Sequence, residues 1–316
     1  MKSSVKIRLA SLDDVKDIVD IYCSNVDHWV KHINGKEVEV RYDDLSVVER
    51  WAHGGPWMSI ETCAIHLNYL LLWNQYPIIA IVDNRAVGEL ELYIGYEENI
   101  LGYHGFIDVL EVHKDYQGRG IGRRLVEEAI RLAIDSNCDT IAVWPDPKVV
   151  EFYRKIGIDR IAYYVKYVRL YLHSVESIGI ESIDIKEFPT DFDTIRYWLF
   201  ISPRIETSFV SWIKNQWDYA IEKNAIKYFS ATIPSLGIAL AIESLWLNHD
   251  EGSLYLWIRE LDILPQVLDA ILSIAKSLGF KNLRLLVSRE IYDRYVSHRY
   301  KHEVIGEYIV LFKKLK

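Results

Sequence analysis

The chain has 316 residues and a formal net charge of -8 at pH 7, so it is long enough for two domains and lacks the dense basic surface that nucleic acids or anionic membranes require. The first residues lead directly into a strand pattern and no apolar run is long enough to span a bilayer, so we expect no signal segment and no membrane partner. The three cysteines form no metal-ligand cluster, which indicates reduced thiols in a cytoplasmic protein without a metal.

Apolar periodicity in the first half of the chain predicts alternating strands and helices. A region rich in Trp and His, residues 27–76, separates the first helix from a hairpin, and its aromatic side chains suit a core or an interface. In chain order, the predicted elements are a strand over 5–9, a helix over 12–26, a helix over 60–73, a hairpin over 78–82 and 86–95, a strand over 105–112, a helix over 123–136, a strand over 140–144 and a short helix over 149–158.

The most informative segment, residues 117–122, is a glycine loop between the fourth of these strands and an amphipathic helix. Glycines let the backbone approach an anion with several N–H groups, and the following helix N-terminus adds a partial positive charge. The loop matches neither the ATP nor the dinucleotide pattern, so acyl-CoA fits it better. The residues expected to hold the pyrophosphate are Gln117, Gly118, Arg119, Gly120, Ile121, Gly122 and Arg123.

This loop resembles motif A of the GNAT N-acetyltransferase superfamily, in which a Gln/Arg-x-x-Gly-x-Gly/Ala sequence holds the pyrophosphate of acetyl-CoA. Downstream, Phe152-Tyr153 followed by Gly157 is similar to the family's Phe-Tyr-x-x-x-Gly-Phe, with Ile158 in place of the last Phe. The resemblance implies acetyl-CoA as co-substrate and an amine as acceptor. It also implies that the segment over 27–76 shapes the acceptor pocket, and that Asp146 and the backbone near Leu110 and Val112 contact the pantetheine arm and the thioester.

The pattern of the first half returns after residue 170, which predicts a degenerate internal duplication. Carboxylates at Glu260 and Asp262 replace the glycine loop and would repel a pyrophosphate. The chain is therefore similar to tandem GNAT proteins, and we expect an α+β fold of two modules, each a mixed sheet flanked by helices, with an active module over 1–172 and a degenerate one over 178–316. The repeated elements are a strand over 182–186, a helix over 191–200, a hairpin over 227–242, a strand over 254–259, a helix over 264–278, a strand over 283–287, a helix over 290–300 and a strand over 304–312.

Acyl transfer to an amine needs a base, a polarised carbonyl group and an acid for the departing thiolate. The resemblance gives Tyr153 as the acid. Asp108 and Glu111 are the candidate bases, and alternation along their strand points them to opposite faces unless a bulge intervenes. We prefer Asp108 and place Glu111 second.

Other residues near these strands leave alternatives open. His104 and His113 are possible bases in accessible loops. Glu89 and Glu91 either steer a cationic amine or are exposed strand residues. We also expect aromatic residues of the second module to wall the acceptor pocket, and the candidates are Trp198, Trp212, Trp217 and Trp246.

Three classes of function fit the sequence. The preferred one is an N-acetyltransferase acting on a small-molecule or peptide amine, as a monomer or homodimer. An acyl-CoA-binding regulatory or sensor protein without turnover is the alternative, and a pure interaction module is the third. The acceptor stays open among polyamines, amino acids, antibiotics and protein N-termini.

Overall fold

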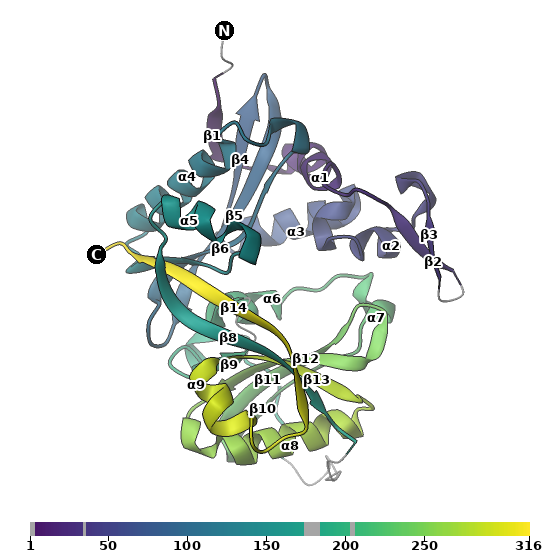
Figure 1. Cartoon of the computed structure of the whole chain (residues 1–316), viewed down its shortest axis with the longest axis vertical. Coiled ribbons are helices and arrows are strands. Elements are labelled where there is room, and N and C mark those ends of the chain that lie inside the picture. The colour runs from purple at the N-terminus through teal and green to yellow at the C-terminus, as the bar shows by residue number, and fades with distance from the viewer. Residues whose placement is uncertain (1–3, 34–35, 174–183, 203–205) are drawn as a thin grey trace. The chain divides into compact units, whose positions relative to one another are not determined.

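The computed structural model describes residues 4–33, 36–173, 184–202 and 206–316 (Figure 1). The chain forms two compact units: unit 1 contains Met1–Ile94, Ile107–Cys138 and Tyr219–Ile221, and unit 2 contains Gly95–Phe106, Asp139–Asp218 and Glu222–Lys316. Each unit draws on both halves of the chain. The expected modules over 1–172 and 178–316 follow the repeat in the sequence and stay a prediction. The two compact units have different boundaries.

Unit 1 contains the strands of the first half up to the glycine loop, except for residues 95–106, which belong to unit 2. Its sheet has the order β1-β4-β5-β6, and a two-residue turn at Asp83 and Asn84, both with positive φ, joins β4 to β5. The hairpin and the helices predicted over 60–73 and 123–136 are confirmed, whereas the small hairpin of β2 and β3 was not predicted. The elements are β1 (Lys6–Leu9), α1 (Val15–Cys23), β2 (Val30–Ile33), β3 (Lys36–Glu39), α2 (Val47–Trp51), α3 (Ile60–Leu72), β4 (Tyr76–Val82), β5 (Arg85–Glu97), β6 (Gly102–Val112) and α4 (Ile121–Asp135).

Helix α4 packs closely on the sheet of unit 1 at one glycine. A Cβ on Gly88 would lie 3.0 Å from Ile121 Cγ2 and 3.1 Å from Leu125 Cδ1. Both Ile121 and Leu125 belong to the apolar face of α4, which is fully buried. Each such side chain contributes about 1.5–3 kcal/mol through its burial, so the start of α4, and with it the end of the glycine loop, is fixed by packing.

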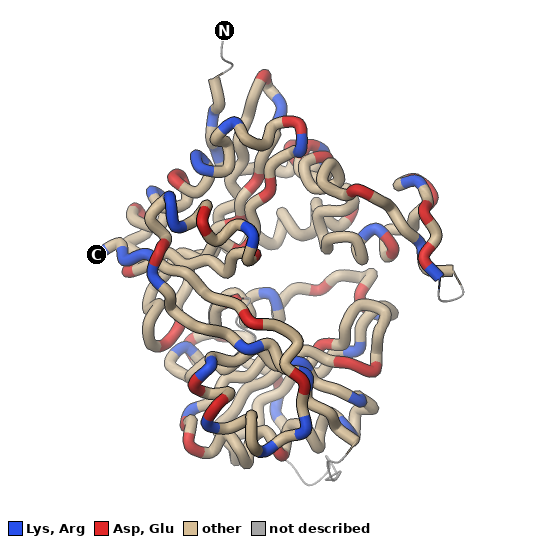
Figure 2. The backbone as a smooth tube through the Cα atoms, viewed as in Figure 1, with Lys and Arg blue, Asp and Glu red and all other residues tan. Residues whose placement is uncertain are grey.

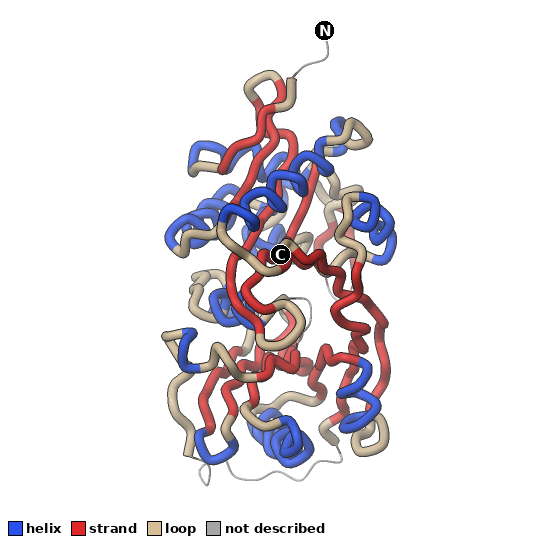
Figure 3. The backbone as a smooth tube through the Cα atoms, turned by 90° about the vertical axis from the view of Figure 1, so that its left-hand side faces the viewer, coloured by secondary structure: helices blue, strands red, loops and turns tan. Residues whose placement is uncertain are grey.

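Unit 2 is a mixed sheet with α8 across one face (Figure 3). Its strands have the order β6-β7-β14-β8-β13-β12-β11-β10, and β9 also pairs with β12. None of the helices that the structure describes is long and apolar enough to cross a membrane. The remaining elements are β7 (Thr140–Val143), α5 (Val150–Lys155), β8 (Arg160–Tyr171), β9 (Leu199–Ser202), α6 (Ser208–Lys214), α7 (Glu222–Ala225), β10 (Tyr228–Ile233), β11 (Ile238–Leu245), β12 (Asn248–Ile258), α8 (Leu264–Ser277), β13 (Asn282–Ser288), α9 (Arg289–Ile291) and β14 (His302–Lys314).

Strands β8 and β14 are the last strands of the two halves of the chain. Each of them pairs with strands of the other half. β14 pairs antiparallel with both β7 and β8, so it separates them. In the same way β8 pairs antiparallel with β13 as well as with β14. Because β7 corresponds to β13 in the repeat, and β8 to β14, each half donates its last strand to the sheet of the other half.

The second half departs from the prediction at three elements. The expected helix over 191–200 is a 3-10 turn, Phe192–Thr194, followed by β9, because the apolar residues after the turn pair with β12. The expected helix over 290–300 is the short α9 followed by a π-helical turn, Tyr292–Val296. Of the expected strand over 182–186, residues 182 and 183 lie outside the described ranges, and Lys186 forms a single bridge with Thr232.

Charged residues are interspersed along both units (Figure 2).

We predict that Leu311→Ala lowers the free energy of unfolding by about 2–5 kcal/mol. Leu311 is 0% exposed, and its backbone pairs with Val143 of β7 and with Ile161 of β8. Val304 on the same strand is 38% exposed, so Val304→Ala should cost less than about 1 kcal/mol. Urea unfolding followed by circular dichroism measures both variants, and equal losses would contradict the central place of β14.

Candidate functional site

The glycine loop lies in unit 1 between β6 and α4, in an open conformation. Gly118 and Gly120 have φ of 73° and 81°, a region that other residues rarely adopt. A Cβ added at either glycine would meet nothing within 4 Å. The loop therefore needs glycine for its backbone conformation, while the space above it is free for a ligand.

Helix α4 adds an electrostatic reason for an anion to bind here. The helix has 15 residues and no acidic residue in its first turn, so its first N–H groups have no intrahelical acceptor and carry a partial positive charge. Arg123 is exposed and its Nε donates to Glu127 at 2.9 Å. Arg119 donates to the carbonyl oxygen of Asp115 at 2.6 Å, which holds its guanidinium beside the loop.

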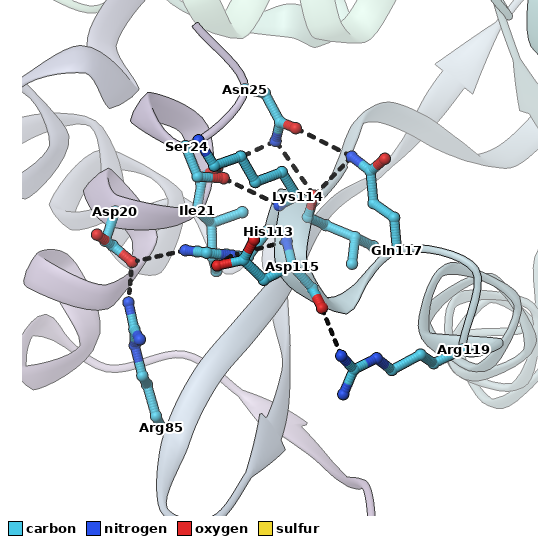
Figure 4. A network of polar contacts seen from close by, with 11 residues as sticks. Asp20, Ile21, Ser24, Asn25, Arg85, His113, Lys114, Asp115, Gln117 and Arg119 are labelled. Carbon is cyan, nitrogen blue, oxygen red and sulfur yellow. Dashed lines mark hydrogen bonds and ion pairs between the residues drawn. The ribbon is translucent and has the colours of Figure 1, made fainter.

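The end of α1 holds the glycine loop through Asn25 (Figure 4). Gln117 Nε2 donates to Asn25 Oδ1 at 2.9 Å and to the carbonyl oxygen of Val112 at 3.1 Å. Asn25 Nδ2 in turn donates to Glu111 Oε1 at 2.9 Å. One amide thus joins the loop to a candidate base. Asn25 was not predicted as a site residue, since a single Asn after a helix is also an ordinary cap.

His113 is part of the same support and is not the accessible base that we considered. It is 7% exposed, and its Nε2 lies 3.2 Å from Asp20 Oδ2 (Figure 4). Its Nδ1 accepts a hydrogen bond from the backbone N–H of Asp115 at 3.2 Å. Asp20 also pairs with Arg85. His113 therefore tethers the start of the loop to α1.

His104, the other histidine considered, belongs to unit 2 and is also buried. Its Nε2 lies 2.9 Å from Thr207 Oγ1, and its Nδ1 lies 2.9 Å from the carbonyl oxygen of Gly102. Burial lowers the pKa of His104. The expectation of an accessible base at this position is wrong, because the side chain has structural partners on both ring nitrogens.

The two candidate carboxylate bases, Asp108 and Glu111, are half-buried on β6. Burial raises the pKa of Glu111 above its usual range. Leu110 and Val112 are also half-buried. The carbonyl oxygen of Val112 accepts from both Asn25 and Gln117, which fixes the end of the strand at the loop.

Glu89 and Glu91 on β5 are the most buried carboxylates of unit 1, at 1% exposure each. The reading of these residues as exposed strand positions is therefore wrong. Tyr22 OH donates to Glu89 Oε2 at 2.6 Å, and Trp57 Nε1 donates to Glu91 Oε1 at 2.8 Å. Burial and the charge of Glu91, with smaller effects of Asp108 and Glu111, raise the pKa of Glu89 well above its usual range.

A residue of the C-terminal half completes this group within unit 1. His66 Nε2 lies 2.8 Å from Glu91 Oε1, and His66 Nδ1 lies 2.8 Å from Tyr219 OH. The ring of Tyr219 packs at 4.9 Å from Trp51 and 5.9 Å from Tyr69. Hydrogen bonds join five side chains into a group that we call the acidic cluster: Tyr22, Trp57, His66, Glu89 and Glu91.

Tyr219 was not among the aromatic residues that the sequence singled out. Trp198, Trp212 and Trp217 are buried within unit 2, where Trp212 Nε1 donates to the carbonyl oxygen of Pro189 at 2.8 Å. That these residues and Trp246 line an acceptor pocket stays a prediction.

Tyr153 and Asp146 belong to unit 2. Tyr153 lies on α5, largely buried beside Phe152, and the segment ends at Gly157, whose φ is 89°. Asp146 is exposed, and its Oδ1 accepts from the backbone N–H of Lys148 at 2.8 Å. Their roles toward the CoA thiol and the pantetheine arm stay predictions. Within the ranges that the structure describes, no group of His, Cys, Asp and Glu has the arrangement of a metal site.

Sequence comparison gives the first evidence from other proteins. The sequence model of the acetyltransferase (GNAT) family matches residues 41–158. An uncharacterised N-acetyltransferase of Porphyra purpurea is 24% identical over 144 residues, which cover 46% of this chain and 73% of that protein. An N-alpha-acetyltransferase of Arabidopsis thaliana is 24% identical over 145 residues, covering 43% of this chain and 74% of its own.

Structural comparison extends over the whole chain. A putative acetyltransferase from Pyrococcus horikoshii has a TM-score of 0.59 at 14% identity, covering 100% of this chain and 91% of that one. A tandem GNAT protein from the clavulanic acid biosynthesis pathway has a TM-score of 0.50 at 12% identity, covering 98% of both chains. At such identities the likeness concerns the fold, and it confirms the α+β class. Residues 41–158 are therefore similar to the GNAT acetyltransferase family, and the named relatives support the conclusion that the protein is an acetyltransferase.

Proposed function

We propose that the protein transfers the acetyl group of acetyl-CoA to an amine by direct attack, and that the first half of the chain carries the reaction. The observation that supports this most strongly is the glycine loop. Gly118 and Gly120 keep the backbone open at the start of a 15-residue helix without acidic residues in its first turn. Such a helix start binds phosphate groups.

In the proposed reaction the neutral amine attacks the thioester carbonyl carbon, the carbon–sulfur bond breaks, and the thiolate leaves with a proton. Asp108 is the preferred base for the acceptor's ammonium group and Glu111 the second candidate. Glu111 is joined to the glycine loop through Asn25. Backbone N–H groups near Leu110 and Val112 are proposed to contact the carbonyl and the pantetheine.

Tyr153 is proposed as the acid that protonates the departing thiolate. Support for this role comes from the Phe152-Tyr153-x-x-x-Gly157 sequence and from the strong burial of the side chain on α5. Asp146 is proposed as a pantetheine contact on the same ground of position in the motif. A cytoplasmic location, and a monomeric or homodimeric state, remain predictions.

The acetyl-CoA site is proposed to be confined to the first half. In the second half, residues 260–263 occupy the position of the glycine loop, and Asp262 Oδ1 lies there as acceptor of a 3.3 Å hydrogen bond from Tyr295 OH. A carboxylate at this place repels a pyrophosphate. The module over 178–316 would therefore be degenerate.

We predict that calorimetry finds one CoA site per chain and that Gly120→Glu raises the Kd at least about 30-fold, which is about 2 kcal/mol. The φ of 81° strains any other residue, and the new carboxylate repels phosphate. Glu260→Gln is the matched control in the second half and should leave the Kd unchanged. Two equivalent sites, or loss of binding in the control alone, would contradict the assignment.

We predict that Asp108→Asn flattens the acidic limb of the kcat/KM profile, measured by thiol release with an acceptor found in an amine panel. A base acts as carboxylate, so activity falls as the pH drops through its pKa. If Glu111 is the base, Glu111→Gln flattens the limb instead, and the limb lies above the usual Glu range because burial raises that pKa. Glu61→Gln, at an exposed position of α3, should keep the profile. An unchanged limb in both strand variants would exclude both carboxylates as the base.

We predict that Tyr153→Phe keeps CoA binding and lowers kcat between roughly ten- and ten-thousand-fold, as loss of a general acid does. Tyr164→Phe is the control, since Tyr164 is half exposed in the same unit. Wild-type turnover in Tyr153→Phe would mean that another group protonates the sulfur.

A further inference from the structure

The internal repeat offers a comparison for the carboxylates of unit 1. His113 N–H donates to the carbonyl oxygen of Val87 at 3.0 Å, and Arg259 N–H donates to that of Gly237 at 3.1 Å. His113 directly follows β6, and Arg259 directly follows β12, the strand at the same place in the repeat. The two bonds are therefore equivalent, and they show which residue of the first half corresponds to which residue of the second. Counting along the strands from them, the counterparts of Glu89, Glu91, Asp108 and Glu111 are Ala239, Ala241, Leu254 and Trp257.

All four counterparts are apolar and fully buried. The same strand pair therefore folds without any of these carboxylates, in the half of the chain that also lacks the glycine loop. A purely structural role for the carboxylates does not explain this difference, because the repeat retains the strands with apolar residues at these four positions. The carboxylates occur together with the proposed acetyl-CoA site.

Glu89, when ionised, has no cationic partner among the residues that the structure describes. Among the residues that the structure describes, Glu89 forms no ion pair, and its single hydrogen bond runs from Tyr22 to Oε2, so Oε1 accepts none. Glu91 differs, since His66 lies against it. A buried carboxylate without a cationic partner costs folding free energy. That cost is removed when a cation binds beside Oε1.

Aromatic rings border the same carboxylates. The rings of Tyr22 and Trp57 stack at 4.9 Å with an angle of 10° between their planes. Trp57 is only half-buried and donates to Glu91. Aromatic faces attract ammonium groups, and the attraction grows where water is excluded. An alkylammonium group would therefore find both charge and ring contacts in the acidic cluster.

We propose that the acidic cluster binds the cationic amino group of the acceptor, and that the acceptor is an amine without a carboxylate within about four carbons of that group. The proposal rests on the proposed acetyl transfer and names its substrate class. A free amino acid is disfavoured, because its carboxylate would approach Glu89, Glu91 and the bases on β6 with no Lys or Arg paired to Glu89 or Glu111 in the described part of the chain.

Three probes of equal chain length test this on the full chain: 1,4-diaminobutane, butylamine and 4-aminobutanoate. Isothermal calorimetry at one ionic strength, with and without saturating CoA, measures their binding. We expect 1,4-diaminobutane to bind at least about tenfold more tightly than 4-aminobutanoate, an effect of one unfavourable charge contact. Butylamine should lie between them.

Three variants test which residues cause the preference for the diamine. Glu89→Gln keeps the shape of the side chain and should remove the preference for the diamine, with CoA affinity unchanged. Tyr22→Phe removes the hydrogen bond but leaves the charge, and it should retain the preference. Glu61→Gln, the exposed control, should behave as the wild type.

Equal binding of diamine and 4-aminobutanoate, no binding of any probe, or an unchanged preference in Glu89→Gln would each overturn the proposal. Failure of CoA to bind would overturn the proposed function instead, and the comparison of probes without CoA remains readable in that case. The comparison in the wild type does not depend on whether a variant folds.

Discussion

The position of β14 between β7 and β8 is the constraint on which the sheet of unit 2 depends. β14 hydrogen-bonds along both edges, so neither half of the chain contains all the strands that its own sheet requires. A fragment that ended at residue 172 would keep β8 but lose β14, leaving unpaired strand edges that favour aggregation. The C-terminal half would therefore have a structural reason to persist even if, as proposed, it binds no acetyl-CoA.

The end of α1 has the same importance for unit 1. Within one turn of this helix, Tyr22 contacts Glu89, and Asn25 contacts both Glu111 and Gln117. Asn25 is uncharged, so it donates to a carboxylate and accepts from the glycine loop without adding charge to either. The proposed pyrophosphate site and the proposed ammonium site are thus both joined to one short segment of the chain.

The proposed role of the acidic cluster in binding a cation would oppose its contribution to stability. The pKa of Glu89 is raised in the folded protein, so folding favours the protonated carboxyl group, and this contribution to stability is lost as the pH rises through the folded-state pKa. Binding of a cation needs the opposite state, the carboxylate. Ala239 and Ala241 avoid this conflict in the second half. Functional sites often carry such a cost in stability.

The sequence by itself determined the elements whose signals are local: the glycine loop, α4, the β4–β5 hairpin and α8 follow from glycine, turn and apolar spacing. Alternation also placed Glu89 and Glu91 on one face, but only the tertiary structure decided that α1 and α3 cover that face. The contact of His66 with Tyr219 spans 153 positions. In the same way β14, the last strand of the second half, lies between β7 and β8 of the first half. Periodicity specifies which face of a segment is apolar and leaves its partner undetermined, because many strands and rings could satisfy the same pattern.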